Sequence, residues 1–344
     1  AGHIPSWKLL IEKMMSAGLL NALFATSTVA AGVDFPARTV VICNADTRGN
    51  DGWRALTASE LQQMTGRAGR RGRDNVGFVV LAPGQFQNPK KIAELLKAPP
   101  DPLESQFRAT YTSLLNLLDA FGNFEQVREI AEKSFAFRES RRASAESRSD
   151  GGAEKLGDRI WQPFELRSRV LNHFGYLDTD TETVTESGKW LADLRIDRPL
   201  LVGEGLRKGV FDDLNIAEAA GLMASVASDA DRSYGEMRAS RRMTEILTDF
   251  QDIVFDVSNV ESKNGVEPAE EINYSAAAAA ERWTAGMEWD ELVGRTRAEE
   301  GDLVRLLSRT GEALRQLANL RKSNPLAAAI AQTASEAILR EPVR

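Results

Sequence analysis

The 344-residue chain has one cysteine, two histidines and no apolar run long enough to cross a bilayer. The single Cys43 excludes a disulfide within the chain, and with His3 and His173 it leaves too few soft ligands for a structural zinc site. The N-terminal "AGHIPSWKLL" lacks the basic and then apolar pattern of a secretion signal. These absences predict a soluble, cytoplasmic protein with no metal site of its own and no membrane partner.

Acidic residues outnumber basic ones over the whole chain, with a net charge of −7. Residues 1–98 reverse this balance: 12 Lys and Arg stand against 7 Asp and Glu, or +5, which leaves −12 for the rest. The first part is therefore suited to phosphate, since a local basic groove is enough to neutralise a nucleic-acid backbone.

Residues 1–98 alternate helix-like and strand-like patterns, which predicts an α/β layer with a buried, mostly parallel sheet. The expected elements are a helix over 8–17, strands within 21–26, 38–44 and 76–83, and a turn-rich hairpin over 46–54. Cys43 ends the second of these strands and is expected to be inert.

Prolines at 99, 100 and 102 mark a domain boundary, and 99–195 is predicted to form the next domain. Within it, 103–135 is helical, the polar stretch 138–158 is an exposed linker, and 164–194 is predicted to form a helix, a strand pair and a helix, as in a winged-helix domain. His173 has apolar neighbours, so a packed core histidine is favoured over a catalytic base.

The last domain, 196–344, is predicted to be a helical bundle. Its expected helices cover 216–228, 233–254, 268–287, 289–295, 302–320 and 326–340, with Asp302 as the N-cap of the fifth. The predicted fold class is α/β plus α: a partial RecA-like lobe, a winged-helix domain and a helical bundle.

The most informative stretch is "QMTGRAGRRGRD", residues 63–74, with arginines at 67, 70, 71 and 73. Arg67 and Arg70 are three apart, so on one helical turn they would project from the same side. Their charged, planar side chains suit bidentate contact with phosphate, and Gln63 could orient a phosphate or an attacking water. An arginine-rich loop that holds a nucleic-acid backbone is the alternative interpretation, and composition alone favours it.

The stretch "ATSTVAAGVDFPARTVVI" lies about thirty residues upstream. It places Thr26 after an expected strand, where a hydroxyl can hold a backbone phosphate. It also contains Gly32, and Asp34, which can accept from a ribose hydroxyl or from the arginines.

Together these stretches resemble motifs V (25–38) and VI (63–72) of superfamily 2 DExH-box helicases of the superkiller and exosome-assisting group. The segment "DPLESQFRATYTSLLNLL" is similar to the one that follows the second RecA-like domain there. "RWTAGMEWDELVGRTRAEEGDLVRLLSRTGEALRQL" looks like the C-terminal helical domain known as DSHCT.

The resemblance implies that Arg67 and Arg70 are arginine fingers that complete an ATP site, and that Gln63 contacts the nucleotide. It implies that Gly32, Asp34 and Gly66 belong to the nucleotide-binding loops.

For the nucleic acid, the resemblance implies that Thr26 touches its backbone and that 46–54 is a hairpin that parts a duplex. Trp53 near the hairpin tip could stack on a base. Arg305 and Arg309, four apart on a long helix, match a helix that lines the strand exit path. An ordinary solvated helix face is the equal alternative for these two arginines.

The chain departs from the family in that it contains no G-x-x-x-x-G-K-[ST] phosphate loop and no acidic box, and in that His3 stands where the family tends to have an apolar residue. We therefore expect the C-terminal part of a helicase of the bacterial, arch-less type, beginning within the second RecA-like lobe. The expected partners are that missing first lobe and single-stranded RNA. The expected cofactors, ATP and Mg²⁺, would be held mainly by the missing lobe, so this chain alone is expected to be inactive.

The sequence leaves two other functions open. A DNA helicase of the same superfamily would use the same phosphate contacts, which do not reveal the sugar. A non-catalytic nucleic-acid-binding module would also lack the phosphate loop.

Overall fold

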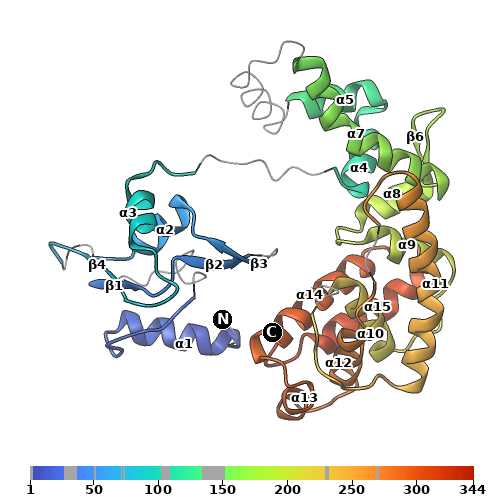
Figure 1. Cartoon of the computed structure of the whole chain (residues 1–344). Coiled ribbons are helices and arrows are strands. Elements are labelled where there is room, and N and C mark those ends of the chain that lie inside the picture. The colour runs from blue at the N-terminus through green and yellow to red at the C-terminus, as the bar shows by residue number, and fades with distance from the viewer. Residues whose placement is uncertain are drawn as a thin grey trace. The chain divides into compact units, whose positions relative to one another are not determined.

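The computed structural model divides the chain into two compact units, Ala1–Leu103 and Glu104–Arg344 (Figure 1). It describes residues 3–26, 37–49, 52–70, 72, 74–101, 109–133, 152–228, 232–268 and 271–344. The division into three domains at 98 and 195 stays a prediction, and each unit is described by itself below.

The first unit contains a small parallel sheet, as the sequence predicted. Its elements are α1 (Pro5–Ser16), β1 (Thr39–Ile42), β2 (Asp46–Gly49), β3 (Gly52–Ala55), α2 (Ala58–Thr65), β4 (Phe78–Leu81) and α3 (Pro89–Lys97). β1 pairs with β4 in parallel, from Thr39 opposite Phe78 to Ile42 opposite Leu81. The antiparallel β2–β3 pair confirms the predicted hairpin.

Two expectations for this unit are wrong. Residues 21–26 form no strand, since no described strand lies beside them to supply hydrogen bonds. The β1–β4 pair is not a buried layer either: Phe78 is 48% exposed and Val80 46%. The described core lies to one side of the pair, and its members are Ile42, Ala45, Leu56, Ala58, Leu61, Ile92 and Leu95. Cys43, just past that core, is exposed rather than buried.

The second unit is almost entirely helical (Figure 1). Its elements are α4 (Tyr111–Phe121), α5 (Phe124–Lys133), α7 (Gly152–His173), β5 (Leu177–Asp178), β6 (Thr183–Val184), α8 (Glu186–Asp193), α9 (Pro199–Arg207), α10 (Ile216–Ala227), α11 (Arg241–Lys263), α12 (Tyr274–Thr284), α13 (Trp289–Thr296), α14 (Glu300–Ala318) and α15 (Pro325–Ile338).

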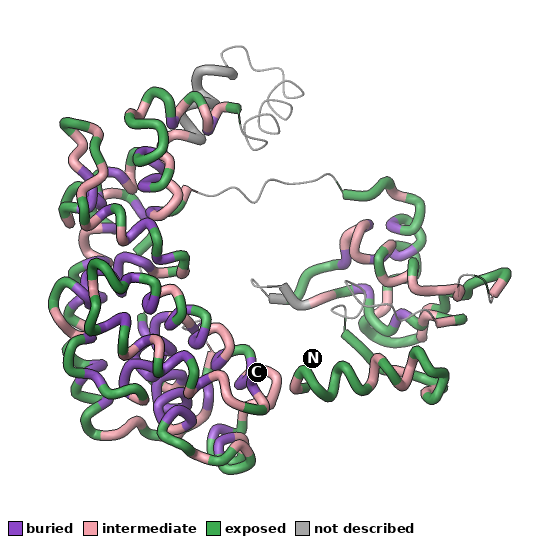
Figure 2. Tube along the Cα trace, turned by 180° about the vertical axis from the view of Figure 1, so that it is seen from behind, coloured by how far each residue is buried: buried purple, intermediate pink, exposed green. Residues whose placement is uncertain are grey.

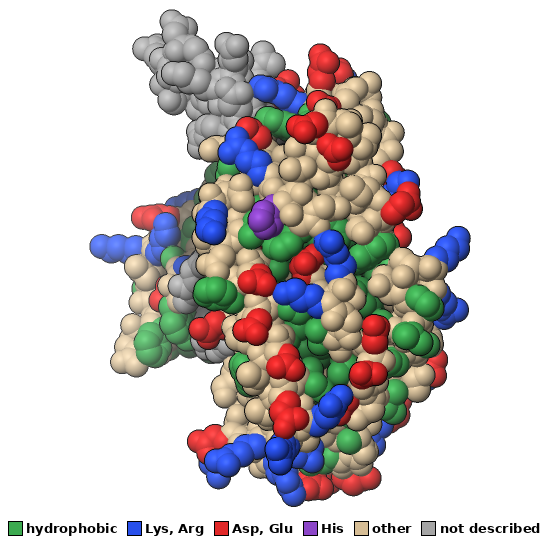
Figure 3. Space-filling model, turned by 90° about the vertical axis from the view of Figure 1, so that its right-hand side faces the viewer, with side chains coloured by type: hydrophobic (Ala, Val, Ile, Leu, Met, Phe, Trp, Pro, Cys, Tyr) green, Lys and Arg blue, Asp and Glu red, His purple; other side chains and the backbone are tan. Residues whose placement is uncertain are grey.

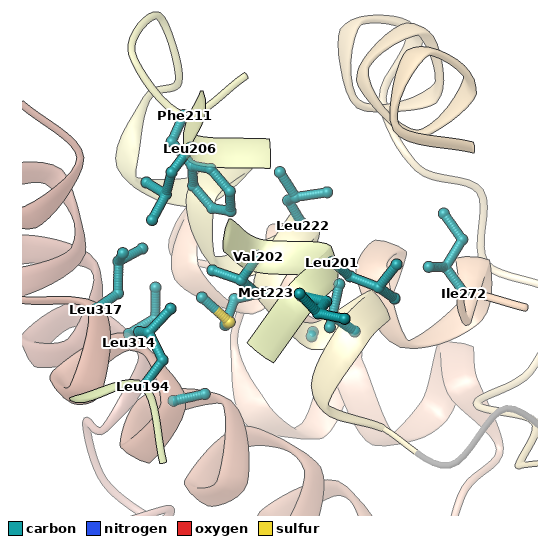
Figure 4. Close-up of a cluster of buried hydrophobic side chains, with 14 of the residues drawn as sticks. Leu194, Leu201, Val202, Leu206, Phe211, Leu222, Met223, Ile272, Leu314 and Leu317 are labelled. Carbon is teal, nitrogen blue, oxygen red and sulfur yellow. The ribbon is translucent and has the colours of Figure 1, made fainter. Parts of the chain in front are cut away.

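Helix α10 is the centre of the C-terminal helices and packs against α12, α14 and α15. A capping box starts it: Asn215 accepts from the Glu218 amide (3.0 Å), and Glu218 accepts from the Asn215 amide (2.9 Å). Its apolar side chains lie in a continuous core with those of α9 and α14, including Leu201, Val202, Leu222, Met223, Leu314 and Leu317 (Figure 4). Buried residues are far denser here than in the first unit (Figure 2).

The middle segment has the predicted order of a helix, a strand pair and a helix. α7 leads into the antiparallel β5–β6 pair, and α8 follows and packs against α4. The linker predicted at 138–158 is helical from Gly152, where α7 begins, and its earlier residues lie outside the described ones.

Three further details of the prediction are wrong. Helix α11 begins at Arg241 rather than 233, because Ser240 accepts the Met243 amide and caps it there. The N-cap of α14 is Glu299, and Asp302 inside the first turn pairs with Arg232 at 2.5 Å. His173 is exposed at the end of α7 and touches Phe174 edge-on, so it is not a packed core histidine.

Candidate functional site

The arginine-rich stretch starts on helix α2, which a capping box fixes at its N-terminus. Thr57 accepts from the Glu60 amide (3.3 Å), and the Glu60 carboxylate accepts from the Thr57 amide (2.9 Å). Ala58 and Leu61 bury one face of the helix, which leaves Gln63 exposed on another. Thus the helix presents Gln63 to the solvent within its last turn.

Arg67 and Arg70 do not share a helical turn, contrary to the prediction. α2 ends at Thr65 with Gly66 as its C-cap, and Arg67 lies in the turn that follows. Ala68 then forms a parallel bridge with Ala37. The helix ends before the arginines because Gly66 has a low helix propensity and because Ala68 pairs with Ala37. The positions of Arg67 and Arg70 are therefore set by the loop backbone and not by helical spacing.

The backbone of this loop is fixed from two sides. On one side, the Ala37 amide donates to the Arg67 carbonyl (3.0 Å), and the Gly69 amide donates to the Ala37 carbonyl (2.7 Å). On the other side lies Gly77, where an added Cβ would be 2.5 Å from the carbonyl atoms of Ala68. Gly69 itself has φ +90°, a conformation that favours glycine. The loop is therefore held between the start of β1 and the start of β4.

Arg70 is bound to Asp74 by both its side chain and its backbone. Arg70 Nε donates to Asp74 Oδ2 (2.8 Å), and Nη2 donates to Oδ1 (2.9 Å). The Arg70 amide also donates to Oδ2 (2.9 Å). These bonds hold the pKa of the Asp74 carboxyl far below its usual range, with the Arg70 side chain the largest cause.

The other predicted nucleotide residues differ in how they are placed. Gly66 is exposed, and Arg67 is half-buried. Gly32 and Asp34 lie outside the described residues. The structure thus brings Gln63, Gly66, Arg67 and Arg70 together on one helix end and its loop.

The predicted strand-binding residues of the first unit lie at its surface. Thr26 is exposed, in the stretch without helix or strand that follows α1. Trp53 is 71% exposed on β3, opposite Arg48 of β2. An exposed indole on a hairpin is a surface on which a base can stack.

The hairpin is tied to α2 by an ion pair that the sequence did not reveal. Arg54 of β3 donates through Nη1 and Nη2 to the two carboxylate oxygens of Glu60 (2.9 and 2.6 Å). These bonds lower the pKa of Glu60. A single carboxylate thus caps α2 and holds the base of the hairpin.

The sequence also did not predict that Asp101 would bind the first turn of α2. Its carboxylate accepts from the Ser59 amide (2.7 Å), and its own amide donates to Ser59 Oγ (2.8 Å). The Ser59 amide is the largest cause that lowers the Asp101 pKa from 3.8 to about 2. The negative charge of Asp101 is also stabilised by the positive end of the helix dipole at the N-terminus of α2.

The two predicted arginines of the helical unit are both on α14. Arg305 is exposed, and Arg309 forms an ion pair with Asp197. On the face that Figure 3 shows, acidic and basic side chains lie interspersed. This pairing favours neither the strand-lining role nor the ordinary surface role.

The described part of the chain fits a phosphate better than a metal ion. Among those residues, no three His, Cys, Asp or Glu side chains come together in a group that could hold a metal. The guanidinium of Arg70 and the amide of Gln63 are donors suited to phosphate oxygens. The described helices also include none that is long and apolar enough to span a membrane.

Two family models match the chain, one in each unit. The model of the helicase conserved C-terminal domain matches residues 8–72, which include Gln63, Arg67 and Arg70. The model of the DSHCT (NUC185) domain matches residues 181–344, which include Arg305 and Arg309.

Several curated proteins are similar to parts of the chain. They include the DExH-box ATP-dependent RNA helicase DExH15 of Arabidopsis thaliana, 38% identical over 39% of this chain. The human exosome RNA helicase MTR4 is 45% identical over 34% of the chain. The probable helicase HelY of Mycobacterium tuberculosis is 38% identical over 40%.

The matched parts span 13%, 11% and 15% of the lengths of these three relatives. The fold, the arginine loop and both family models nevertheless agree with one another. Residues 8–72 thus match a helicase conserved C-terminal domain and residues 181–344 match a DSHCT domain, an order consistent with the C-terminal portion of a superfamily 2 DExH helicase.

Proposed function

We propose that the chain is the C-terminal part of an ATP-dependent RNA helicase that couples ATP hydrolysis to strand translocation and unwinding. The observation that carries this proposal is the arginine loop: a backbone fixed between β1 and β4, with Arg70 oriented by Asp74 at its edge. A loop held in this way suits a phosphate that must be met in one geometry, because donors that are already in place need no reorganisation.

The roles of the individual residues follow from their chemistry. When bound, ATP supplies a γ-phosphate on which negative charge spreads as the phosphoryl group is transferred. Arg67 and Arg70 would bind its oxygens and stabilise that charge, and Gln63 would contact the nucleotide. Gly32 and Asp34 would complete the loops around it, and the exposed Gly66 would let the backbone approach closely.

Residues of each unit would contact the strand. Thr26 would contact its backbone, Trp53 would stack on a base at the hairpin, and Arg305 and Arg309 would line its exit. RNA is favoured over DNA because DExH15 of Arabidopsis thaliana and human MTR4, to which the chain is similar, are RNA helicases. The segment from α7 to α8 would serve as a winged-helix domain.

The experiment uses a protein in which a first RecA-like lobe precedes this chain, and it measures strand-stimulated ATPase and strand affinity. Arg67→Ala and Arg70→Ala should each lower kcat on the order of 10³-fold, the lower end of what an arginine finger contributes. RNA affinity should stay within about twofold. Lys90→Ala, which changes an exposed cation of the same unit, is the control and should change neither. An equal loss of kcat and affinity in the arginine variants would contradict the finger roles.

A non-catalytic nucleic-acid-binding module is the second candidate, because the sequence contains no phosphate loop. The isolated chain should hydrolyse no ATP on either account. The two functions are distinguished by adding the first lobe. This addition should produce ATPase activity if the chain is part of a helicase, and none if it is a non-catalytic module. A cytoplasmic location and the bacterial, arch-less type stay predictions.

A further inference from the structure

We propose that Asp74 is a positioning residue, which holds one edge of the Arg70 guanidinium so that the other edge is presented to the phosphate of the nucleotide. This inference rests on the proposed function, and it assigns to Asp74 a role that the motif arginines alone do not explain.

The bonds between the two residues determine which edge is used. A guanidinium has five N–H donors, and Asp74 takes the one on Nε and one on Nη2. The two on Nη1 and the second on Nη2 remain, and they have no partner among the described residues. Nη1 and Nη2 together form the edge that binds a phosphate in bidentate fashion.

The exposed fractions of the two side chains agree with this assignment of the guanidinium edges. The Asp74 side chain is 8% exposed and that of Arg70 is 40% exposed. The carboxylate therefore lies on the inner side and the guanidinium on the solvent side. Arg70 is left reachable by a ligand while its inner edge is held.

The anchor itself is fixed to the backbone. Asp74 Oδ2 accepts from the Arg70 amide, and the Asp74 amide donates to the Arg70 carbonyl (2.9 Å). One residue earlier, Gly69 is held by Ala37 and lies against Gly77. The side chain thus has a rigid base, which a donor needs if it is to meet a transition state without rearranging.

Charge supports the same role. Arg70 is the main group that lowers the Asp74 pKa, and Arg38 adds to the effect, so the carboxylate stays ionised at working pH. An exposed ion pair four residues apart on a helix contributes little to stability. This pair lies in a loop, and its three bonds from Arg70 to one carboxylate fix an orientation rather than a helix.

The first test compares Asp74→Asn with Arg70→Ala in the protein that carries a first lobe. An asparagine offers one acceptor oxygen where the carboxylate offers two, so the guanidinium would lose its fixed orientation. We expect kcat to fall on the order of 10- to 100-fold, the effect of a small misplacement of a reacting group. KM for ATP, RNA affinity and the melting temperature should change little. The control is Glu129→Gln, which removes an ion pair of the same spacing on α5 and should have no effect.

The second test uses chemical rescue. In Arg70→Ala, the Asp74 carboxylate remains to hold free guanidinium, so millimolar guanidinium should restore part of kcat. In Arg70→Ala/Asp74→Asn, the same addition should restore nothing. A merely structural Asp74 would give equal rescue in both variants.

The outcomes separate the two proposals. If Arg70→Ala leaves kcat unchanged, the proposed finger role fails. If Arg70→Ala lowers kcat while Asp74→Asn does not, or if rescue does not depend on Asp74, the finger role stands and the positioning role is wrong. Should Asp74→Asn melt at a lower temperature, both rescue measurements are made below the melting temperature of Arg70→Ala/Asp74→Asn, so that the double variant is folded when its rescue is compared with that of Arg70→Ala.

Discussion

At the scale of single residues, the packing of Gly77 against Ala68 and Gly69 sets the backbone position from which the Arg70 side chain extends. The two backbones touch because neither Gly69 nor Gly77 has a side chain. Gly77 lies seven residues after Arg70 in the sequence, outside the arginine motif. A glycine before a strand has no distinctive pattern, so the role of Gly77 could not be predicted from the sequence.

Gly77→Ala should displace the loop, because its Cβ would lie 2.5 Å from Ala68 and 2.6 Å from the Gly69 nitrogen. We expect a loss of about 1–3 kcal/mol in the unfolding free energy of the first unit, as for other overpacked sites. Strand-stimulated kcat should fall in the protein with a first lobe. Gly84→Ala is the matched control, since its Cβ would meet nothing within 4 Å. Equal effects of the two substitutions would contradict this account.

Tyr176 offers a residue-scale test in the second unit. Its hydroxyl donates to Glu204 (2.7 Å), whose side chain also pairs with Arg207 (3.3 Å) and is largely buried. Burial is the main cause that raises the Tyr176 pKa, so the hydroxyl stays a donor. Tyr176→Phe keeps the ring but leaves the buried carboxylate without this bond.

We expect Tyr176→Phe to lower the free energy of unfolding by about 1–3 kcal/mol, measured by urea denaturation. Tyr274→Phe serves as the control, because its side chain is 45% exposed, and the change should stay within about 0.5 kcal/mol. A loss below that limit for Tyr176→Phe would mean that water replaces the hydroxyl.

At the scale of elements, helix α2 links the hairpin, Asp101 and the arginine loop of the first unit. Glu60 ties its first turn to the hairpin, Asp101 binds Ser59 beside it, and the arginine loop follows its last turn. Residues far apart in sequence are thereby held to one eight-residue helix.

The stability of the first unit should decline between about pH 4 and pH 2. An unfolded aspartate has a pKa near 3.8, whereas that of folded Asp101 is about 2. As pH falls, the unfolded chain binds the proton first, so the contribution present above pH 4 is lost through this window. Glu60, whose pKa is also lowered, acts in the same direction. Asp101→Asn should flatten this part of the pH profile of the melting temperature, and an unchanged profile would exclude Asp101 as a source.

The elements also show what a sequence can and cannot predict. The parallel strands, the hairpin and the C-terminal helices followed from apolar periodicity and turn residues. The ends of α2 and α11 did not, since they depend on pairing with Ala37 and on a cap at Ser240. Of the site, Gln63, Arg67 and Arg70 could be found from the motif. Asp74, Gly77 and Asp101 could not, because their roles come from contacts made after folding.

At the scale of the whole molecule, the two units differ greatly in their cores. The described core of the first unit has seven buried apolar residues, and the cluster of the second unit extends from α4 to the C-terminus. Hydrophobic burial is the dominant favourable term in folding, so the units should differ in stability.

Calorimetry of the full chain should therefore show two transitions, with that of the first unit at the lower temperature. Gly77→Ala should lower only the first transition, and Tyr176→Phe only the second. A single transition that both substitutions shift equally would mean that the chain unfolds as one cooperative body.

The bond between Arg70 and Asp74 also bears on counterion release. Each cation that neutralises a phosphate of a single strand contributes about 0.7 to the slope of log affinity against log salt concentration. Arg70 already has an anionic partner within the protein. Arg70→Ala should therefore leave this slope for RNA unchanged, whereas a drop of about 0.7 would place Arg70 on the strand. A stretch that looks strongly basic in sequence thus adds less to the ionic attraction of RNA than its number of arginines implies.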